Sequence, residues 1–187
     1  MDTYLELTDE QIVKKCVSDS AFLAVLINRY EQKLDLYIRR KSNTTKEDRK
    51  DILQNVFIKV YKNINDFDQG LKFSSWIYRI AHNEMIDWYR KEKTHPVLHF
   101  EDDETLINKI VSDVDVQKES IQKELRAHIE KVLQTLTSEY QEVVQLRFFE
   151  EKSYEEISDI LQIPPGTVAI RINRVKKKLK ELLHESR

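Results

Sequence analysis

Residues 74–93 hold the side chains of this chain best suited to bind unstacked bases. The segment reads SSWIYRIAHNEMIDWYRKEK, so its tryptophans and tyrosines lie among arginines, amides and lysines. Aromatic rings can stack on the bases of a single strand, and nearby cations can meet the strand's backbone. The alternative is that Trp76, Trp88 and Tyr89 are core residues, and we expect at least one of them to be buried.

A second stretch, residues 153–183, has the pattern of a short helix, a tight turn and a longer helix. Ser153 and Glu156 form an S-x-x-E capping box, which begins the first helix. Pro164 ends it, because proline and the residue before it disfavour a helical backbone, and Pro165 suits the first position of the next helix. Apolar residues recur at helical spacing in this second helix: Val168, Ile172, Val175, Leu179 and Leu182.

A polar and basic stripe lies beside these apolar residues, and it contains Thr167, Arg171, Arg174, Lys177 and Lys178. Two helices of this size, the second with one apolar and one basic stripe, are typical of a helix-turn-helix. The apolar side packs on the first helix, and the basic side meets phosphates and base edges in the major groove. The alternative is a solvated charged face, and only the rest of the chain distinguishes the two.

The distribution of charge supports a local nucleic-acid surface. The 187 residues allow one or two small domains, and the net charge of −2 excludes a general polyanion binder. Residues 165–187 contain seven Lys/Arg against two Glu, whereas residues 97–124 contain eight Asp/Glu against three Lys. The acidic stretch from Pro96 onwards predicts a mobile linker, and we place a domain boundary there.

Nothing in the sequence indicates a catalytic, metal or membrane-spanning segment. The five histidines lack ligand spacing, the acidic cluster 101–104 falls in the linker, and no Gly-rich phosphate loop is found. We therefore expect no enzyme, no metal and no cofactor. The single cysteine, Cys16, is expected to fill the core. With an acidic N-terminus and no apolar run long enough to span a membrane, the protein is predicted to be cytoplasmic.

The scarcity of helix breakers predicts an all-α fold, since the chain has two glycines and three prolines. Thr8, with Gln11, should cap a first helix, Ser20 should open a second, and Thr45 should cap a third. The third helix is expected to bury Leu53, Val56, Phe57, Val60, Tyr61 and Ile64. Asp48, Asp51, Gln54 and Asn55 remain on another side, which the residues alone indicate is solvated. The loop 65–73 follows, and its Phe67, Leu71 and Phe73 either pack beneath it or line a pocket.

With these elements laid out, the chain closely resembles a bacterial sigma factor of the extracytoplasmic-function (ECF) type, from the sigma-70 family. The resemblance runs from Phe22 to Leu183 and is carried by three motifs in order. They are DILQNVFIKVY at 51–61, FSSWIYRIAHNEMIDWYRK at 73–91, and LTSEYQEVVQLRFFEEKSYEEISDILQIPPGTVAIRINRVKKKL at 136–179. The resemblance implies sigma domain 2 over residues 1–95, a flexible acidic linker over 96–118, and sigma domain 4, with the helix-turn-helix, over 119–187.

The resemblance also implies partners and the residues that meet them. Asp51, Gln54 and Phe57 match the family motif that binds the clamp helices of the RNA polymerase largest subunit, and Asp48 is grouped with them. The polymerase flap is a further expected contact. A loop that holds a flipped base is matched by Asp66 to Lys72, and the helix that recognises and opens the minus-ten box is matched by residues within 73–91. The expected minus-ten residues are Asp66, Phe67, Gly70, Lys72, Phe73, Trp76, Tyr78, Arg79, Asn83, Asp87 and Arg90.

For the upstream, minus-thirty-five box, the resemblance implies recognition by the second helix of the helix-turn-helix. The expected residues are Ser153, Tyr154, Thr167, Ile170, Arg171, Arg174, Lys177 and Lys178. The chain departs from the family pattern at Pro164, Ala169 and Ile170, so apolar contact with a thymine methyl could replace basic contacts there. The expected partners are core RNA polymerase, double- and single-stranded promoter DNA and an anti-sigma factor.

Three rival functions explain less of the chain. A free-standing helix-turn-helix regulator leaves residues 51–93 unused, and a nuclease would need its carboxylates on a rigid element. An adaptor that binds only protein gives the basic stripe no role. We therefore predict a transcription initiation factor that binds core polymerase, directs it to promoters and helps to open the minus-ten element by capturing flipped bases.

Overall fold

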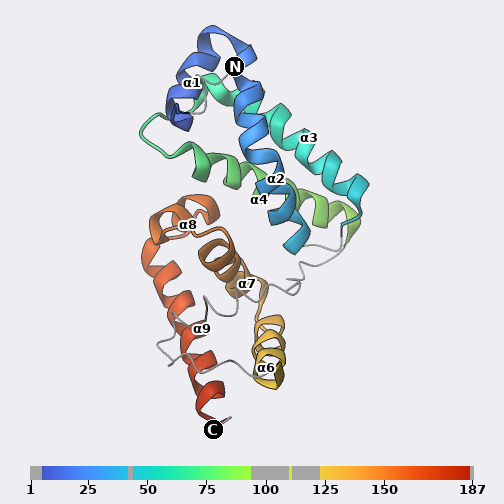
Figure 1. The fold of residues 1–187 in the computed structure, drawn as a ribbon, viewed down its shortest axis with the longest axis vertical. Helices are drawn as coiled ribbons and strands as arrows, with labels where there is room; N and C mark the ends of the chain where they lie inside the picture. The colour runs from blue at the N-terminus through green and yellow to red at the C-terminus, as the bar shows by residue number, and fades with distance from the viewer. Residues whose placement is uncertain (1–5, 42–43, 94–109, 111–122, 186–187) are drawn as a thin grey trace. The chain divides into compact units, whose positions relative to one another are not determined.

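The computed structural model describes residues 6–41, 44–93, 110 and 123–185, and the regular structure in these ranges is helical. The chain divides into two compact units, each of which is described here by itself. Helices α1 to α4 form the N-terminal unit, and α6, α7, α9 and most of α8 form the C-terminal unit (Figure 1). The predicted all-α fold with two helical domains is confirmed. The expected linker at 96–118 lies outside the described residues, apart from Ile110.

Capping boxes begin two helices of the N-terminal unit. Thr8 and Gln11 cap α1, and Thr45 and Asp48 cap α3, each with both reciprocal hydrogen bonds. These confirm the predicted starts of α1 and α3, whereas the start expected at Ser20 is capped by Asp19, whose side chain accepts the Ala21 amide at 2.9 Å. The elements are α1 (Asp9–Ser18), the 3-10 turn η1 (Ser20–Phe22), α2 (Leu23–Lys41), α3 (Lys46–Asn63), the 3-10 turn η2 (Ile64–Asp66) and α4 (Phe73–Glu92).

The core of the N-terminal unit lies where α2, α3 and α4 meet. α3 packs against both α2 and α4, while α1 packs against α2 and α4; Figure 1 shows α4 crossing α2. The side chains at their contacts are fully buried: Leu26, Leu34, Ile38, Val56, Val60, Ile77 and Ala81. Cys16 is also buried, as predicted, and burial raises the pKa of its thiol.

Three side chains of α3 differ from the sequence prediction, and one of them is Phe57, which was expected to be buried and is half-buried. Tyr61 was expected in the core but is 58% exposed, whereas Ile52 is buried at 3% exposure. The reason is the helical period: Ile52 and Val56 are four residues apart on the buried face, and Tyr61 follows Gln54 by seven residues on the opposite face.

The C-terminal unit contains four helices in the part of the chain that is described, as predicted. They are α6 (Lys123–Gln134), α7 (Ser138–Val144), α8 (Tyr154–Leu161) and α9 (Pro165–Glu185), with the π-helical turn η3 (Gln145–Phe149) continuing α7. α9 packs against α6 and α7. Fully buried side chains from all four helices and from η3 form its core: Ile129, Leu133, Val143, Leu146, Ile157, Val168 and Ile172.

The turn between α8 and α9 is held by local hydrogen bonds. The Ser158 hydroxyl donates to the Ile163 carbonyl at 2.6 Å, and the Ile163 amide donates to the Ser158 carbonyl at 3.3 Å. α8 ends at Leu161 and not at Pro164 as predicted, because Gln162 adopts the left-handed conformation with φ of 55°. Pro165 is the first residue of α9, as predicted. This turn sets α8 and α9 as a helix-turn-helix.

Candidate nucleic-acid interface

One face of α4 brings together five of the eleven residues predicted to meet the minus-ten element. Trp76, Arg79, Asn83, Asp87 and Arg90 follow one another at steps of three or four, so they share one side of the helix. Asn83 and Arg90 are exposed, and the other three are half-buried. The Asp87 carboxylate accepts a long hydrogen bond of 3.4 Å from Arg90. The face thus offers one large ring, an amide and charges of both signs.

The Trp76 ring rests on a cluster of aromatic side chains. Its centroid lies 5.2 Å from that of Phe67 and 5.7 Å from that of Phe73. Phe67 and Phe73 contact each other edge to face, with centroids 5.8 Å apart. Both phenylalanines belong to the predicted minus-ten set, and they are 6% and 0% exposed in this structure. Phe67 and Phe73 pack beneath the loop, as one sequence interpretation allowed, and they hold Trp76 in place.

Tyr78, also in the predicted minus-ten set, lies in the core of this structure. It is 2% exposed, and its ring packs edge to face against Tyr37 of α2 at 5.2 Å. The cause is its position on the helix, because residue 78 lies next to the buried Ile77 and away from the Trp76 face. Tyr89 is also buried, which confirms that at least one aromatic residue of the segment belongs to the core.

The loop before α4 exposes polar groups above this aromatic cluster. Asp66, Gly70 and Lys72 are exposed. The Asp68 side chain accepts the Gly70 amide at 2.9 Å, and its carbonyl accepts the Leu71 amide at 3.0 Å, which closes a turn. A Cβ at position 70 would lie 3.2 Å from the Asp68 carboxylate, so glycine fits the close approach of this turn.

The exposed face of α3 carries a stripe of polar and apolar residues. Asp51 and Gln54 are exposed as predicted, and Ile58 and Tyr61 continue the same side of the helix at 42% and 58% exposure. Sequence analysis missed these two apolar residues as part of the surface, although their spacing of four and seven from Gln54 places them there. Phe57 lies half-buried beside the stripe. We call residues 51, 54, 58 and 61 the α3 stripe.

Asp48 has a different role in the structure. Its carboxylate accepts hydrogen bonds from the Thr45 amide at 2.9 Å and the Thr45 hydroxyl at 2.8 Å. It is therefore half of the capping box of α3. These two hydrogen bonds engage one oxygen of the Asp48 carboxylate, which was predicted to contact polymerase.

A groove of about 550 Å³ runs between α3 and α4. Lys59 of α3 forms an ion pair with the buried carboxylate of Glu84 of α4. The groove is lined by Asn55, Ile58, Lys59, Lys62, Glu84, Asp87, Arg90 and Lys91. It joins the α3 stripe to the C-terminal end of the α4 face, so the two surfaces are continuous.

The basic stripe of α9 is partly engaged by α7. Arg171 forms an ion pair with Glu139 at 2.8 Å, and its side chain is 17% exposed. Arg174 is exposed and donates to the Tyr140 hydroxyl at 2.9 Å. Ile170 is 55% exposed. Lys177 and Lys178 are exposed further along the helix, and Thr167 is half-buried at its start.

Ser153 and Tyr154 support α8 in the structure. The Ser153 hydroxyl accepts the Glu156 amide at 3.2 Å, and the Ser153 amide donates to the Glu156 carboxylate at 2.8 Å, as the predicted capping box requires. The Tyr154 ring is half-buried and faces the guanidinium of Arg147 at 5.6 Å. Ser153 and Tyr154, two members of the predicted minus-thirty-five set, thus make structural contacts at the start of α8.

Within the residues that the structure describes, no cluster of His, Cys, Asp and Glu could hold a metal ion. Across those same ranges, no helix has the length and apolar character needed to cross a membrane.

Comparison with known proteins identifies the family. Residues 26–95 match the model for Sigma-70 region 2, and residues 126–179 match the model for Sigma-70, region 4. The chain is 34% identical over 187 residues to the ECF RNA polymerase sigma factor SigW of Bacillus subtilis, an alignment that covers 94% of this chain and 99% of SigW. The chain belongs to the sigma-70 family, as an ECF sigma factor.

Solved structures agree with this fold. The ECF sigma factor is similar to CnrH, from its complex with the cytosolic domain of CnrY, with a TM-score of 0.63 and 22% identity over 96% of this chain and 99% of CnrH. It is also similar to the sigma factor RpoE of Bartonella quintana, with a TM-score of 0.58 and 20% identity over 88% of this chain and 98% of RpoE.

Family membership establishes the general function. This ECF sigma factor is a transcription initiation factor that binds RNA polymerase and recognises promoters, and it is not an enzyme. The α3 stripe and the α4 face lie within the residues matched to region 2, and the basic stripe of α9 lies within those matched to region 4.

Proposed function

We propose that the α3 stripe binds core RNA polymerase, that the α4 face and its loop open and read the minus-ten element, and that α9 reads the minus-thirty-five box. The observation that carries this proposal is the division of α4 into two faces. A half-buried tryptophan on aromatic supports heads a row of polar side chains, and the opposite face is core. Such a row suits the capture of unstacked bases.

The α3 stripe has the composition of a protein-binding surface. Ile58 and Tyr61 offer apolar area at the centre and end of the stripe, beside the exposed polar side chains of Asp51 and Gln54. A tyrosine that is 58% exposed on a helix is typical of interfaces rather than of solvated surface. The stripe and Phe57 would meet the clamp helices of the largest subunit.

The α9 stripe fits duplex DNA. Arg174, Lys177 and Lys178 are exposed on one side of a helix that follows a closed turn, which is the arrangement that places a recognition helix in the major groove. Arg171 and Thr167 would lie nearest the bases at the helix start. The polymerase flap is proposed to contact the same unit.

An anti-sigma factor is a further proposed partner. The solved structure of CnrH is a complex with the cytosolic domain of CnrY, and that of RpoE from Bartonella quintana is a complex with the anti-sigma factor NepR. By this likeness we propose that an anti-sigma protein covers DNA- and polymerase-binding surfaces of this chain.

Since promoter DNA and RNA polymerase are the partners of this sigma factor, we propose that the sigma factor acts in the cytoplasm. The domain limits 1–95, 96–118 and 119–187 are also retained as a proposal.

The first experiment is a pull-down of bacterial core RNA polymerase by the full chain. The pair Gln54→Ala/Phe57→Ala should abolish capture, and because Phe57 is half-buried, Gln54→Ala and Tyr61→Ala are also tested singly. Gln32→Ala, an exposed change on α2, is the matched control and should bind normally. Each single variant should weaken binding by about 1–2 kcal/mol, because interface residues that matter for binding cost more than about 1 kcal/mol when truncated to alanine. Full binding by all stripe variants would refute the assignment of this surface.

A further inference from the structure

α4 begins without a side-chain cap of its own. Its N-cap residue is Lys72, whose side chain makes no capping hydrogen bond. The first amides of a helix lack partners within the helix, and a carboxylate placed there also interacts favourably with the helix dipole. In this structure the amide of Phe73, the first residue of α4, donates to the carboxylate of Glu10 at 3.2 Å. A residue of α1, 63 positions earlier in the chain, thus supplies the cap.

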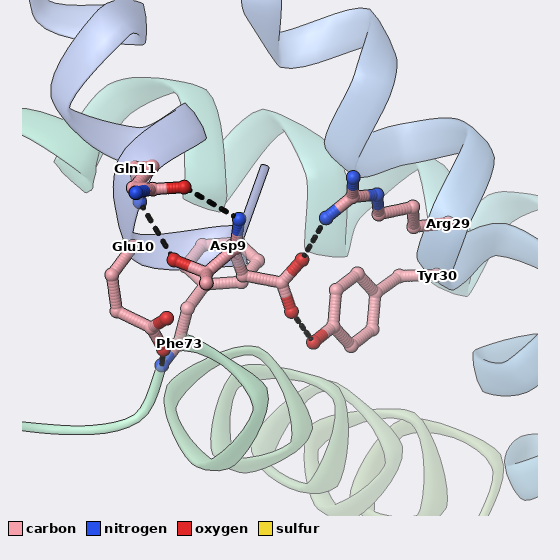
Figure 2. A network of polar contacts seen from close by, with 7 residues as sticks. Asp9, Glu10, Gln11, Arg29, Tyr30 and Phe73 are labelled. Atoms are coloured by element: carbon pink, nitrogen blue, oxygen red, sulfur yellow. Dashed lines mark hydrogen bonds and ion pairs between the residues drawn. The ribbon is translucent and has the colours of Figure 1, made fainter. Parts of the chain in front are cut away.

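The neighbouring residue fixes the position of Glu10. Asp9 accepts a hydrogen bond from Arg29 at 2.8 Å and another from the Tyr30 hydroxyl, both from α2 (Figure 2). Burial, together with the hydrogen bond to Asp9, raises the pKa of Tyr30 above its usual range, so its hydroxyl stays protonated and remains a donor. Figure 2 shows Asp9 directed towards Arg29 and Tyr30, while Glu10 extends to the start of α4. The first turn of α1 is therefore bound to two other helices.

The same contacts reach the Trp76 ring. Tyr30, which donates to Asp9, packs its ring edge to face against Phe73 at 5.5 Å. Phe73 in turn contacts both Phe67 of the loop and Trp76 of the α4 face. The backbone of Phe73 is held by Glu10 and its side chain by Tyr30, so α1 and α2 fix the residue on which the loop and Trp76 rest.

We propose that Glu10 is a positioning residue for minus-ten recognition, because it caps α4 and so sets where the loop 66–72 and the Trp76 ring meet a flipped base. The proposal rests on the proposed function of the α4 face. Glu10 does not contact DNA in this scheme, since a carboxylate would repel the phosphates. It acts through the amide of Phe73 alone.

The test compares Glu10→Ala with Glu10→Gln in holoenzyme assembled from the full chain and core polymerase. The probe is a single-stranded oligonucleotide that carries the non-template minus-ten sequence of a promoter opened by the wild-type holoenzyme. Glu10→Ala should lower the affinity roughly threefold to tenfold, the loss expected for a charged cap at a helix start. Glu10→Gln keeps an acceptor oxygen and should stay within about twofold of wild type. Glu6→Ala removes the same charge from an exposed position and should have no effect.

A second measurement separates positioning from loss of the fold. In Glu10→Ala, amide hydrogen exchange should accelerate at residues 67–73, while the amides of α2 and α3 and the affinity for core polymerase stay as in wild type. Oligonucleotide affinity of Glu10→Ala equal to wild type overturns the proposal, and so does a parallel loss of core binding and of protection throughout the unit. A wild-type holoenzyme that forms normally yet cannot bind any minus-ten strand would instead overturn the proposed function of α4.

Discussion

α4 and α9 both carry a row of side chains that we propose to meet nucleic acid, but the two rows are supported in different ways. α4 holds Trp76 on buried rings that come from the preceding loop and from its own first turn, and its start is capped from α1. α9 holds its arginines by polar contacts from α7, through Glu139 and Tyr140, and follows a turn closed within a few residues. One site is built on packing across the unit, and the other on local hydrogen bonds and charge.

This difference matches the two forms of DNA that the proposed function requires. Unstacked bases are bound by ring stacking, which needs an aromatic side chain in a fixed place, with cations nearby to meet the backbone of the strand. A duplex is bound through its phosphates and base edges, which needs cations on a helix that fits the major groove. The α4 face carries one ring and charges of both signs, while the α9 stripe contains four cations at 171, 174, 177 and 178. Packing against buried rings therefore suits the single ring of α4, and polar contacts suit the cations of α9.

The largest expected effect breaks the packing that supports α4. Phe73→Ala removes a side chain that is 0% exposed, so the free energy of unfolding of the N-terminal unit should fall by about 3–5 kcal/mol. Both tryptophans of the chain lie on α4, so urea unfolding followed by tryptophan fluorescence reports this unit. Val17→Ala, at a site that is 59% exposed, is the control and should cost under about 0.5 kcal/mol. Equal midpoints for the two variants would contradict the supporting role of Phe73.

A second prediction removes the ring and leaves its support in place. Trp76→Ala should weaken binding of a single-stranded minus-ten oligonucleotide by about 1–3 kcal/mol, since a stacked ring contributes that much per base. Trp76→Phe keeps a ring and should recover part of the loss. Permanganate reactivity of promoter thymines should fall in parallel for Trp76→Ala, whereas affinity for a duplex minus-thirty-five fragment should not change. A normal promoter bubble with Trp76→Ala would show that stacking is not the role of this residue.

The contrast between the two helices also explains what the sequence could predict. Caps at Thr8, Thr45 and Ser153 were predicted correctly, because each depends on residues three apart and on the local backbone. The buried stripe of α9 followed from helical spacing in the same way. Local chemistry therefore determined the helix-turn-helix almost completely.

Two tyrosines, Tyr78 and Tyr61, differ in exposure from what the sequence interpretation expected. Tyr78 was placed at DNA and is buried, whereas Tyr61 was placed in the core and is exposed. A tyrosine side chain suits either the core or the surface, so its position on the helix decides whether it is buried. For both tyrosines the helical period agrees with the burial that the structure shows. The contacts of Glu10 with Phe73 and of Glu139 with Arg171 could not be predicted at all. The partners in these contacts are 63 and 32 residues apart in the sequence, respectively, so each contact depends on how two separate helices pack together.

A third prediction sharpens the comparison within α9. Arg174→Ala should weaken duplex minus-thirty-five binding by about 1–3 kcal/mol if it contacts a base. Arg171→Ala should cost less, under about 1 kcal/mol, because Glu139 already offsets much of its charge. Fluorescence anisotropy of holoenzyme with a labelled duplex, repeated over a series of salt concentrations, measures both.

The double variant gives the control for this ordering. In a Glu139→Gln background Arg171 loses its ionised partner, so the cost of Arg171→Ala should rise towards that of Arg174→Ala. The ordering would be wrong if Arg171→Ala cost at least as much as Arg174→Ala in the wild-type background, or if Glu139→Gln left the cost of Arg171→Ala unchanged.

The smallest expected effect concerns the turn on which α9 depends. Gln162 has φ of 55° and ψ of 44°, a left-handed conformation that costs a side-chain-bearing residue about 1–2 kcal/mol. Glycine adopts it without that strain but loses about 0.5–1 kcal/mol more in backbone entropy on folding. Gln162→Gly should therefore stabilise α8 and α9 by about 0.5 kcal/mol, measured by amide exchange in these helices. Lys180→Gly, at an exposed position inside α9, should destabilise them by about 0.5–1 kcal/mol. Opposite signs at the two sites would show that the turn is limited by its own backbone, whereas destabilisation by both would mean that the Gln162 side chain contributes more than the strain costs.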